Sequence, residues 1–216
     1  RGLGDVYKRQ ALESEDVAVL STAQVAALSG TQVAALTTDQ VVAMKPAQVA
    51  SLTSLAVAAL TTEQVPALLT SQFTSLTTQQ VAAFSSAQWA SAGTQQLAAL
   101  KPAQVMAIAT AQITGLTTEH MESLSKIQVA SLTTAQLQAL STAQIAAIDS
   151  ESLAGMTTAQ VQSLKTEQMA ALTSAQVAGL KLAQLAALSS TSLRALTTGS
   201  MVALGSDQFK SLSTAQ

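Results

Sequence analysis

Hydrophobic and polar residues recur along this chain with a period of eight from residue 12 to residue 216. We label the positions a to h, with a at Leu12 and at every eighth residue after it. Position a holds Leu, Met, Ile or Phe in 25 of 26 repeats, with Ala92 as the exception, and position f is apolar in all 25 repeats from Val17 onward. Position e is Gln in 20 of 26 repeats, c is Ser or Thr in 21 of 26, and h is Ala, Ser or Gly in 24 of 25. No insertion interrupts the pattern, which indicates a tandem array rather than a conventional globular domain.

A period of eight disfavours one long helix. An α-helix turns about 100° per residue, so eight residues overshoot two turns by about 80°. The apolar side chains at a and f would therefore wind around the helix instead of staying on one face, and no single partner surface could bury them. A coiled coil needs a period of about 3.5 or 3.67 residues, and neither divides eight.

A β-solenoid is the alternative fold. Positions a and f lie five residues apart and would face opposite sides of one straight strand. The segment f–g–h is rich in Ala, and both Ala and Gln are poor strand residues. Because a bend at b and c would restore the geometry, the β-solenoid stays open on the sequence alone.

One short helix in every repeat explains more of the pattern. If b is the N-cap, then c, d and e are the first three helical positions. Thr133 with Gln136, and Ser141 with Gln144, then form capping boxes in which each partner satisfies one main-chain donor. The repeat is therefore typical of a helix that starts at c and ends near h.

Residues that did not define the repeat support this interpretation. Position c is N1, the helical position that tolerates proline, and it holds Pro46 and Pro102. Acidic residues favour the first helical turn, and seven of the 12 occupy d: Glu15, Asp39, Glu63, Glu119, Glu151, Glu167 and Asp207. Four of the six lysines after residue 10 occupy b, just past the preceding helix: Lys45, Lys101, Lys165 and Lys181. Gly93 and Gly205 also stand at b, where the chain must turn. Pro66, at g, removes a helical hydrogen bond, and we expect a local kink there.

Helices this short are stable only when they pack on one another. A helix of about six or seven residues is unstable alone, because nucleation is costly. Positions f and a lie on one face, and the small residues at h let neighbouring backbones approach. We therefore predict an all-α tandem-repeat solenoid of very short helices, one per repeat, with Leu and Val inside, Ser, Thr and Gln on the rim, and the repeats stacked on one another.

Composition narrows the class of protein. The 216 residues are 48% hydrophobic, 10% charged and 2% aromatic, with net charge −2. Disorder is disfavoured by the high hydrophobic content, and nucleic-acid binding by the absence of a basic surface interleaved with aromatics. There is no cysteine, so disulfides and thiolate metal sites are excluded. Ser, Thr and Gln interrupt every apolar run before the roughly 18 to 20 residues that membrane insertion requires.

The first ten residues, RGLGDVYKRQ, do not fit the repeat. They match, codon for codon, a translation of a transposon-end sequencing adapter, which suggests a conceptual translation from an assembled metagenomic contig. We therefore treat 1–10 as not biological. We expect 11–216 to be a single octad-repeat solenoid that is truncated at both ends, because its true N-terminus would be missing and its last repeat stops partway.

Candidate chemistry is sparse. His120 is the only histidine, with Glu119 and Glu122 beside it, but a metal site would need further ligands from a neighbouring turn. We interpret it as a substitute for the e-position glutamine. Triads built on histidine and phosphate-binding glycine loops have no counterpart here. We predict no catalytic, cofactor-binding or metal-binding residues, no cofactor, and no enzyme.

The aromatic, methionine and polar columns have structural explanations too. Trp89 and Phe84 occupy f and a beside the undersized Ala92, so we expect core filling rather than a ligand platform. Five methionines occupy a or f and should be core: Met44, Met121, Met156, Met169 and Met201. Met106 stands at g and should lie on the rim. The glutamines could cap helices locally or form an amide ladder between turns, and we favour capping with some stacking. Helix capping would account for the Ser and Thr columns, although ice binding and O-glycosylation are functional alternatives.

Runs such as LTTAQLQAL (Leu132–Leu140) and LTSAQVAGL (Leu172–Leu180) resemble octapeptide repeats of very large bacterial surface or secreted proteins. Those proteins carry labels such as adhesin-like, haemagglutinin-like or haem-utilisation. The resemblance covers residues 12–216 and implies location at the cell surface or outside the cell, with no catalytic motif to transfer.

The sequence thus favours a non-enzymatic spacer or stalk, in which stacked helices set a length and present other domains. Protein or glycan contacts would then be made through domains outside this sequence. The alternative is a binding module that uses the Ser/Thr/Gln-rich surface to contact protein, glycan or ice. A binding module should gather its variable residues on one face, whereas the variable positions d and g carry scattered residue types.

Overall fold

The computed structural model describes residues 13–216, which fold into 24 α-helices and one 3₁₀ helix with no strand among them. The predicted all-α repeat is therefore confirmed, and the β-solenoid alternative is wrong. The adapter-like segment 1–10 lies outside the described residues. The chain forms two compact units that divide between Ile108 and Ala109, and each is described by itself.

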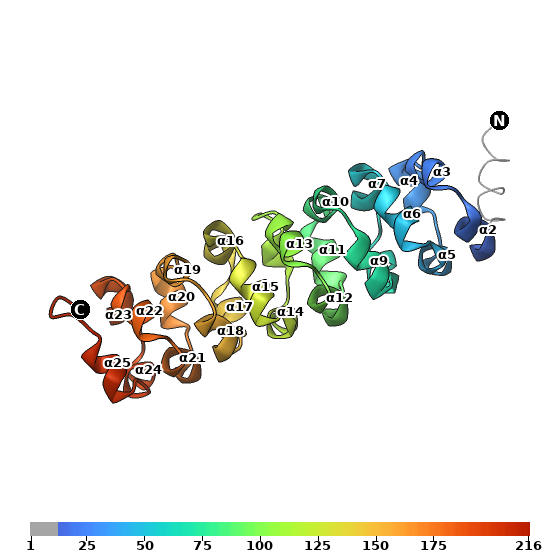
Figure 1. Cartoon of the computed structure of the whole chain (residues 1–216). Coiled ribbons are helices and arrows are strands. Elements are labelled where there is room, and N and C mark those ends of the chain that lie inside the picture. Colours follow the sequence, from blue (N-terminus) through green and yellow to red (C-terminus); the bar gives the residue numbers. More distant parts are fainter. Residues whose placement is uncertain (1–12) are drawn as a thin grey trace. The chain divides into compact units, whose positions relative to one another are not determined.

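The first unit contains twelve short helices in its described part (Figure 1). They are α2 (Ser14–Val19), α3 (Thr22–Ala26), α4 (Gly30–Ala34), α5 (Thr38–Ala43), α6 (Pro46–Ser51), α7 (Ser54–Ala58), α8 (Gln64–Ala67), α9 (Thr70–Ser75), α10 (Thr78–Ala83), α11 (Ser86–Ser91), α12 (Thr94–Ala98) and α13 (Pro102–Ala107).

The second unit begins with the 3₁₀ helix and continues in the same style. Its elements are η1 (Ile113–Gly115), α14 (Thr118–Ser123), α15 (Lys126–Ser131), α16 (Thr134–Ala139), α17 (Thr142–Ala146), α18 (Ser150–Ala154), α19 (Thr158–Gln162), α20 (Thr166–Ala170), α21 (Ser174–Ala178), α22 (Leu182–Ala186), α23 (Ser190–Ala195), α24 (Thr198–Val202) and α25 (Ser206–Lys210).

Each regular helix starts and stops at the predicted positions, as α10 illustrates. Thr77, at b, is extended (φ −73°, ψ 160°), and its hydroxyl accepts from the main-chain N–H of Gln80 at 3.2 Å. The Gln80 Oε1 accepts in turn from the N–H of Thr77 at 2.8 Å, which completes the capping box. The helix ends at Ala83, and its C-cap Phe84, at a, is extended again (φ −61°, ψ 138°). A local pattern of eight residues therefore specifies one helix and one turn.

The turns do not use glycine conformations. No described residue has a positive φ, and Gly93 and Gly205 have φ values of −82° and −77°. The chain does turn at these two b positions, as expected, but each glycine is the extended N-cap of the following helix. The chain turns because a and b are extended, which any residue can adopt.

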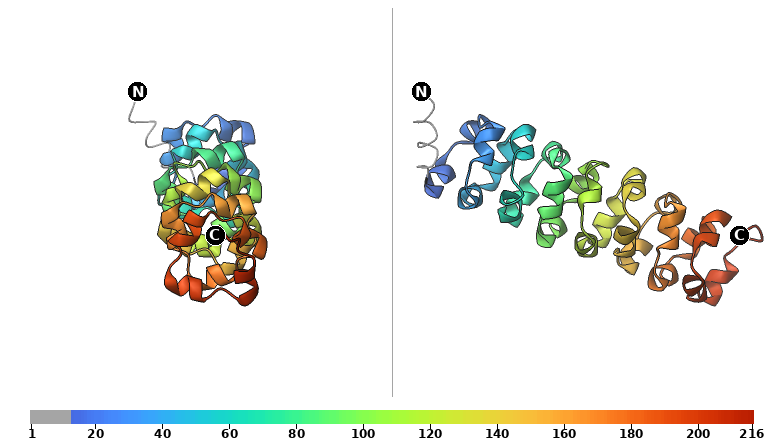
Figure 2. Two further views of the ribbon diagram at one scale, coloured as in Figure 1. Left: turned by 90° about the vertical axis from the view of Figure 1, so that its left-hand side faces the viewer. Right: turned by 180° about the vertical axis from the view of Figure 1, so that it is seen from behind.

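Within each unit, a helix packs on the helix three repeats further along the chain. In the first unit α2 packs on α5, α3 on α6 and α4 on α7, and in the second unit α15 packs on α18 and α20 on α23. Three octads therefore make one turn of the solenoid. Figure 2 shows the stacked helices of each unit from two further sides.

The core of each unit consists of the f and a side chains. Val81 is fully buried and Leu76 is 4% exposed. Backbones come close between turns: a Cβ added to Gly30 would lie 2.9 Å from the Cβ of Ala59, one turn away. The small residues at h, such as Ala59, therefore permit the close stacking that the sequence predicted.

Two repeats depart from the pattern. Pro66 shortens α8 to four residues, Gln64–Ala67, because it has no N–H to donate to the carbonyl of Thr62 in the preceding turn. The expected local effect of Pro66 is therefore a shorter helix rather than a kink. At η1 the b residue is Ala109, which offers no oxygen to cap a helix, and the repeat forms a 3₁₀ helix; Leu69 and Gly93 also give no side-chain cap, yet α-helices follow them. The Oε1 of Gln112 is buried there without a hydrogen-bond partner.

Candidate functional site

The most regular polar feature is a column of buried glutamines at e. Gln80 is 2% exposed. While its Oε1 caps its own helix, its Nε2 donates to the main-chain oxygens of Val49 (3.0 Å) and Leu52 (2.7 Å). Those two oxygens belong to the last turn and the C-cap of α6. The Val49 oxygen also accepts from the N–H of Leu52 at 3.2 Å, whereas the Leu52 oxygen lies past the end of the helix, where carbonyls lack partners within it. One amide therefore satisfies the beginning of one helix and the end of another.

The same contact recurs through both units. The Nε2 atom donates to carbonyls 28 to 31 residues earlier from Gln48, Gln64, Gln72, Gln80, Gln88, Gln96, Gln104, Gln144, Gln160, Gln168, Gln176, Gln184, Gln208 and Gln216. The acceptors lie in the preceding turn of the solenoid. Capping with stacking between turns is therefore confirmed, but the partner of each amide is a main-chain carbonyl.

His120 occupies a glutamine position and takes over the capping role. It is 3% exposed, its Nδ1 accepts from the N–H of Thr117 at 3.1 Å, and its own N–H donates to the Thr117 hydroxyl at 3.2 Å. The interpretation of His120 as a substitute in the cap is confirmed. Within residues 13–216, no group of three or more His, Cys, Asp or Glu side chains could hold a metal ion.

Three aromatic residues form a cluster in the first unit. Trp89 and Phe84 are fully buried, as is Phe73 from α9, and the ring centroids of Phe84 and Trp89 lie 5.0 Å apart. Phe73 lies 5.8 Å from Phe84 and 6.2 Å from Trp89. Core filling is therefore confirmed, and a fully buried indole cannot serve as a surface platform. The Trp89 Nε1 has no hydrogen-bond partner.

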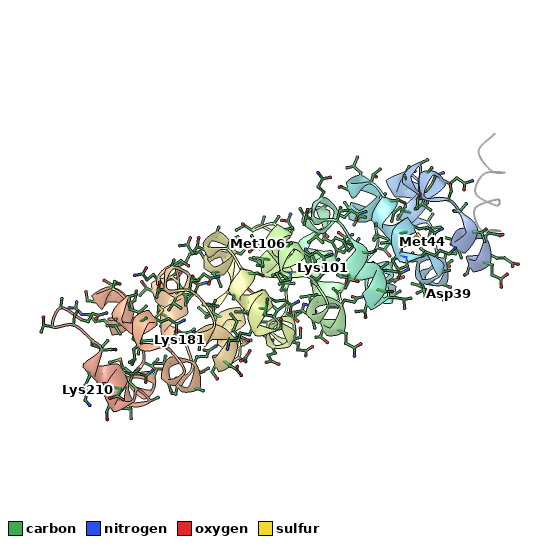
Figure 3. All side chains as sticks on the ribbon, viewed as in Figure 1. Asp39, Met44, Lys101, Met106, Lys181 and Lys210 are labelled. Atoms are coloured by element: carbon green, nitrogen blue, oxygen red, sulfur yellow. The ribbon has the colours of Figure 1, made fainter. Side chains whose placement is uncertain are left out.

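The methionines largely follow their positions. Four of the five expected in the core are buried: Met44, Met121, Met156 and Met169. Met201, in α24, remains partly solvent-accessible, so the expectation of a core position is wrong for it. No later turn of the described chain packs over α24. Met106 is 53% exposed, as predicted for g, and Figure 3 labels it together with Met44.

The two hydroxyl columns have different roles. Hydroxyls at b cap helices, as Thr133 does for the N–H of Gln136 at 3.1 Å. Residues at c occupy N1, where a side chain does not cap, and Thr134 and Thr142 are exposed. The expectation that capping accounts for both columns is therefore wrong for c, whose hydroxyls face solvent.

Several residues that differ from the repeat consensus line a shallow depression in the first unit. It encloses about 400 Å³ and is lined by residues 66–70 and 93–96 of two successive turns. Leu69 and Gly93 both stand at b, where most repeats have Ser or Thr, and exactly three octads separate them. Gly93 has no side chain to fill the depression, and Leu69, which is 48% exposed, lines it together with Thr70, Thr94 and Gln95. We did not predict this site, although the spacing of one full turn between the two departures was a usable signal.

Charges on the surface are few and scattered. Lys126 forms an ion pair with Glu151 at 3.3 Å between turns, and Lys210 forms one with Asp207 at 3.3 Å. Lys101 and Lys181 stand at b, while Lys210 lies on α25 (Figure 3).

Asp149 caps α18 by accepting from the N–H of Ser152 at 2.9 Å. Burial acts to raise the pKa of this carboxyl, but hydrogen bonds from Ser152 and Glu151 and the charge of Lys126 outweigh it, so the pKa lies below its ordinary value. The carboxylate is therefore the form that caps the helix.

The fold and the glutamine column define a class: a tandem-repeat protein whose eight-residue units each form one helix and stack as a helical solenoid. The chain belongs to the ALTTAQ repeat family, whose model matches residues 10–45, 42–70, 93–126, 145–182 and 180–214. A comparison with curated proteins found no match. No helix within residues 13–216 is long and apolar enough to cross a membrane.

Proposed function

We propose that this chain is a non-enzymatic spacer or stalk segment of a large bacterial surface or secreted protein, with an adhesin-like context. The observation that carries the proposal is the repeated use of the same side chains for stacking. Position b caps, f and a form the core, h gives close approach, and the glutamine at e joins one turn to the next. Because the side chains at these positions serve to stack one turn on the next, the segment is suited to set a length between other domains.

A spacer should grow in fixed steps. The second unit offers a direct test: a copy of residues 157–180, three octads, inserted after Leu180. The chain has no cysteine, so Ala143→Cys and Ser206→Cys would place two fluorophores on exposed positions. Each inserted turn should lengthen the distance between dyes by about 8–10 Å, the spacing of packed helices.

An insertion of half an octad at the same point is the matched control, because it exchanges core and surface positions and should reduce helical circular dichroism. If the three-octad insertion leaves the distance between the dyes unchanged, the spacer proposal fails. The proposed cellular context is tested by reading the gene and its flanking sequence on one intact contig. A secretion signal, wall anchor or adhesin head would support the proposal, and a cytoplasmic catalytic domain would overturn it.

The depression between Leu69 and Gly93 favours a second candidate, a binding module for a small neutral ligand. Its lining of Thr70, Thr94 and Gln95 carries no charge, so a hydroxyl-rich compound such as a monosaccharide suits it best. Binding of a sugar panel, followed by isothermal titration, should be lost in Gly93→Gln. No binding by any member of the panel would exclude this candidate.

A further inference from the structure

The two hydroxyl columns of the repeat are retained to different extents. Position c is Ser or Thr in 21 of 26 repeats, whereas position b, which caps the helix, is Ser or Thr in only 16 of 26. The repeats have diverged by substitution, since d holds residues as different as Leu55, Gln79 and Glu151. Copying of one ancestral octad therefore does not explain why the column that caps helices is the less constant of the two.

The hydrogen bonds of the cap explain why b can vary. In α19 the hydroxyl of Thr157 accepts from the N–H of Gln160 at 3.2 Å, and the Gln160 Oε1 accepts from the N–H of Thr157 at 2.8 Å. Where b is Lys165, the second of these bonds remains, at 2.9 Å from its N–H to Gln168 Oε1, and α20 still forms. A hydroxyl at b therefore improves a cap that the glutamine already half completes.

The structure shows no comparable use for the hydroxyls at c. Thr158, the residue after the cap, occupies N1 of α19 and is exposed. Its hydroxyl forms no hydrogen bond within the described chain, and the same holds for Thr134 and Thr142. All 21 Ser and Thr residues at c lie among the described residues, and none of them is buried. Folding therefore gives no reason to keep a hydroxyl at c.

We propose that the c hydroxyls are acceptor sites for O-linked glycosylation by a separate glycosyltransferase. In this reaction the hydroxyl oxygen attacks the anomeric carbon of a nucleoside-diphosphate sugar. The new carbon–oxygen bond replaces the bond to the diphosphate, which leaves with the bonding electrons, and the hydroxyl proton passes to a base of the transferase. A sugar attached at N1 points into solvent, where it displaces no hydrogen bond of the cap and no core side chain.

The charges beside c favour a neutral sugar over a phosphate. All seven acidic residues at d directly follow a Ser or Thr at c, as Glu119 follows Thr118 and Glu167 follows Thr166. A phosphate would add a charge of about −1.5 to −2 next to each of these carboxylates, whereas a neutral sugar adds no repulsion. This inference does not depend on the spacer function, because any exposed repeat can carry an acceptor hydroxyl.

Peptide mass spectrometry of the protein, purified from the cells that express it, tests the proposal. Trypsin should release the segment Ile127–Lys165, which contains four hydroxyls at c and three at b. Its mass should exceed that of the polypeptide by whole monosaccharide residues, and fragmentation that preserves the side-chain bond should place them at c. An unmodified segment, sugars at b as often as at c, or additions with the mass of phosphate would each overturn the proposal.

Neighbouring substitutions in the unmodified recombinant chain test whether folding needs the c hydroxyls. Thr133→Ala and Thr157→Ala remove hydroxyls at b and should each lower the midpoint of urea unfolding. Thr134→Ala and Thr158→Ala, at c of the same two helices, should leave the midpoint unchanged. If the c variants lower it as much as the b variants do, a role in folding explains the retention of c and the proposal is overturned.

Discussion

The glutamine column makes a strong prediction about charge. Gln80→Glu keeps the oxygen that caps the helix but replaces the Nε2 donor with a second carboxylate oxygen. That oxygen would face the carbonyls of Val49 and Leu52, to which the amide now donates at 3.0 and 2.7 Å. Glutamate is the usual acidic partner in a capping box, so a purely local role would tolerate this change.

The magnitude follows from burial. Gln80 is 2% exposed, and a buried polar group left without its partner costs about 1–3 kcal/mol. The Leu52 oxygen loses its donor, the Val49 oxygen keeps only the N–H of Leu52, and a buried carboxylate faces both. At pH 7 we therefore expect Gln80→Glu to lower the free energy of unfolding by about 3–5 kcal/mol. Desolvation and the carbonyl dipoles should raise the pKa of the introduced carboxyl above its unfolded value of about 4.3.

That raised pKa fixes the direction of the pH effect. The protonated acid can donate one hydrogen bond to the carbonyls, so the variant is most stable relative to wild type below the unfolded pKa. The advantage is lost as the pH rises through the folded pKa. Urea unfolding followed by circular dichroism at pH 4 and pH 7, with wild type measured at both, isolates this difference.

Gln24→Glu is the matched control. Gln24 has the same capping box with Ser21, yet it is exposed and donates to no earlier turn in the described chain. We expect this variant to change the free energy of unfolding by less than about 0.5 kcal/mol. Equal losses at the two positions would refute the reasoning, because the bond between turns would then contribute nothing beyond the cap.

Four further variants test other features. Trp89→Ala should cost about 3–5 kcal/mol by opening a cavity in the aromatic cluster, and an unchanged thermal melting curve would contradict this. His120→Gln should alter stability by less than about 1 kcal/mol in urea unfolding, since glutamine is the standard residue there; a large loss would indicate another role for the histidine. Pro66→Ala should lengthen α8 and raise stability by about 1 kcal/mol or more, and a fall in the melting temperature would count against it. Asp149→Ala should lower the free energy of unfolding by about 1 kcal/mol at neutral pH, because it removes an N-cap. Since the folded pKa of this carboxyl is lowered, the difference between variant and wild type should vanish as the pH falls well below 3.8. A loss of stability that does not depend on pH would show that the charge is irrelevant.

Much of the fold was predictable because the determinants are local. A hydroxyl at b and a glutamine at e lie three positions apart, and their mutual bonds fix where each helix begins, as Thr77 and Gln80 show. The f and a side chains follow from the same register. Chemistry within one octad therefore specified the helix, its cap and its buried face.

The arrangement of the helices was not predictable in the same way. The number of repeats per turn depends on how side chains at f, a and h pack between turns, and no single repeat contains that information. The second role of Gln80 was likewise hidden, since its carbonyl partners lie 28 and 31 residues earlier. The recurrence of the amide, where a carboxylate would cap equally well, was the available hint that a donor is needed.

The candidate site was missed for a related reason. Leu69 and Gly93 look like isolated exceptions in the linear sequence, and they become neighbours only when three octads are known to make one turn. Departures from the consensus at b therefore carry information only after the helical arrangement is known.

The rule that each helix rests on the one three repeats before it has a consequence for how such an array can change in length. Most repeats offer the same donors, acceptors and apolar side chains, so removing or adding one whole octad leaves most surviving helices with an equivalent support. Such an event rotates all later surface residues by one third of a turn but breaks no class of contact. Loss of a single residue, in contrast, would exchange buried and exposed positions in everything that follows. The array therefore tolerates insertion or deletion of whole repeats but not of other lengths, so the number of repeats can change without loss of the structure.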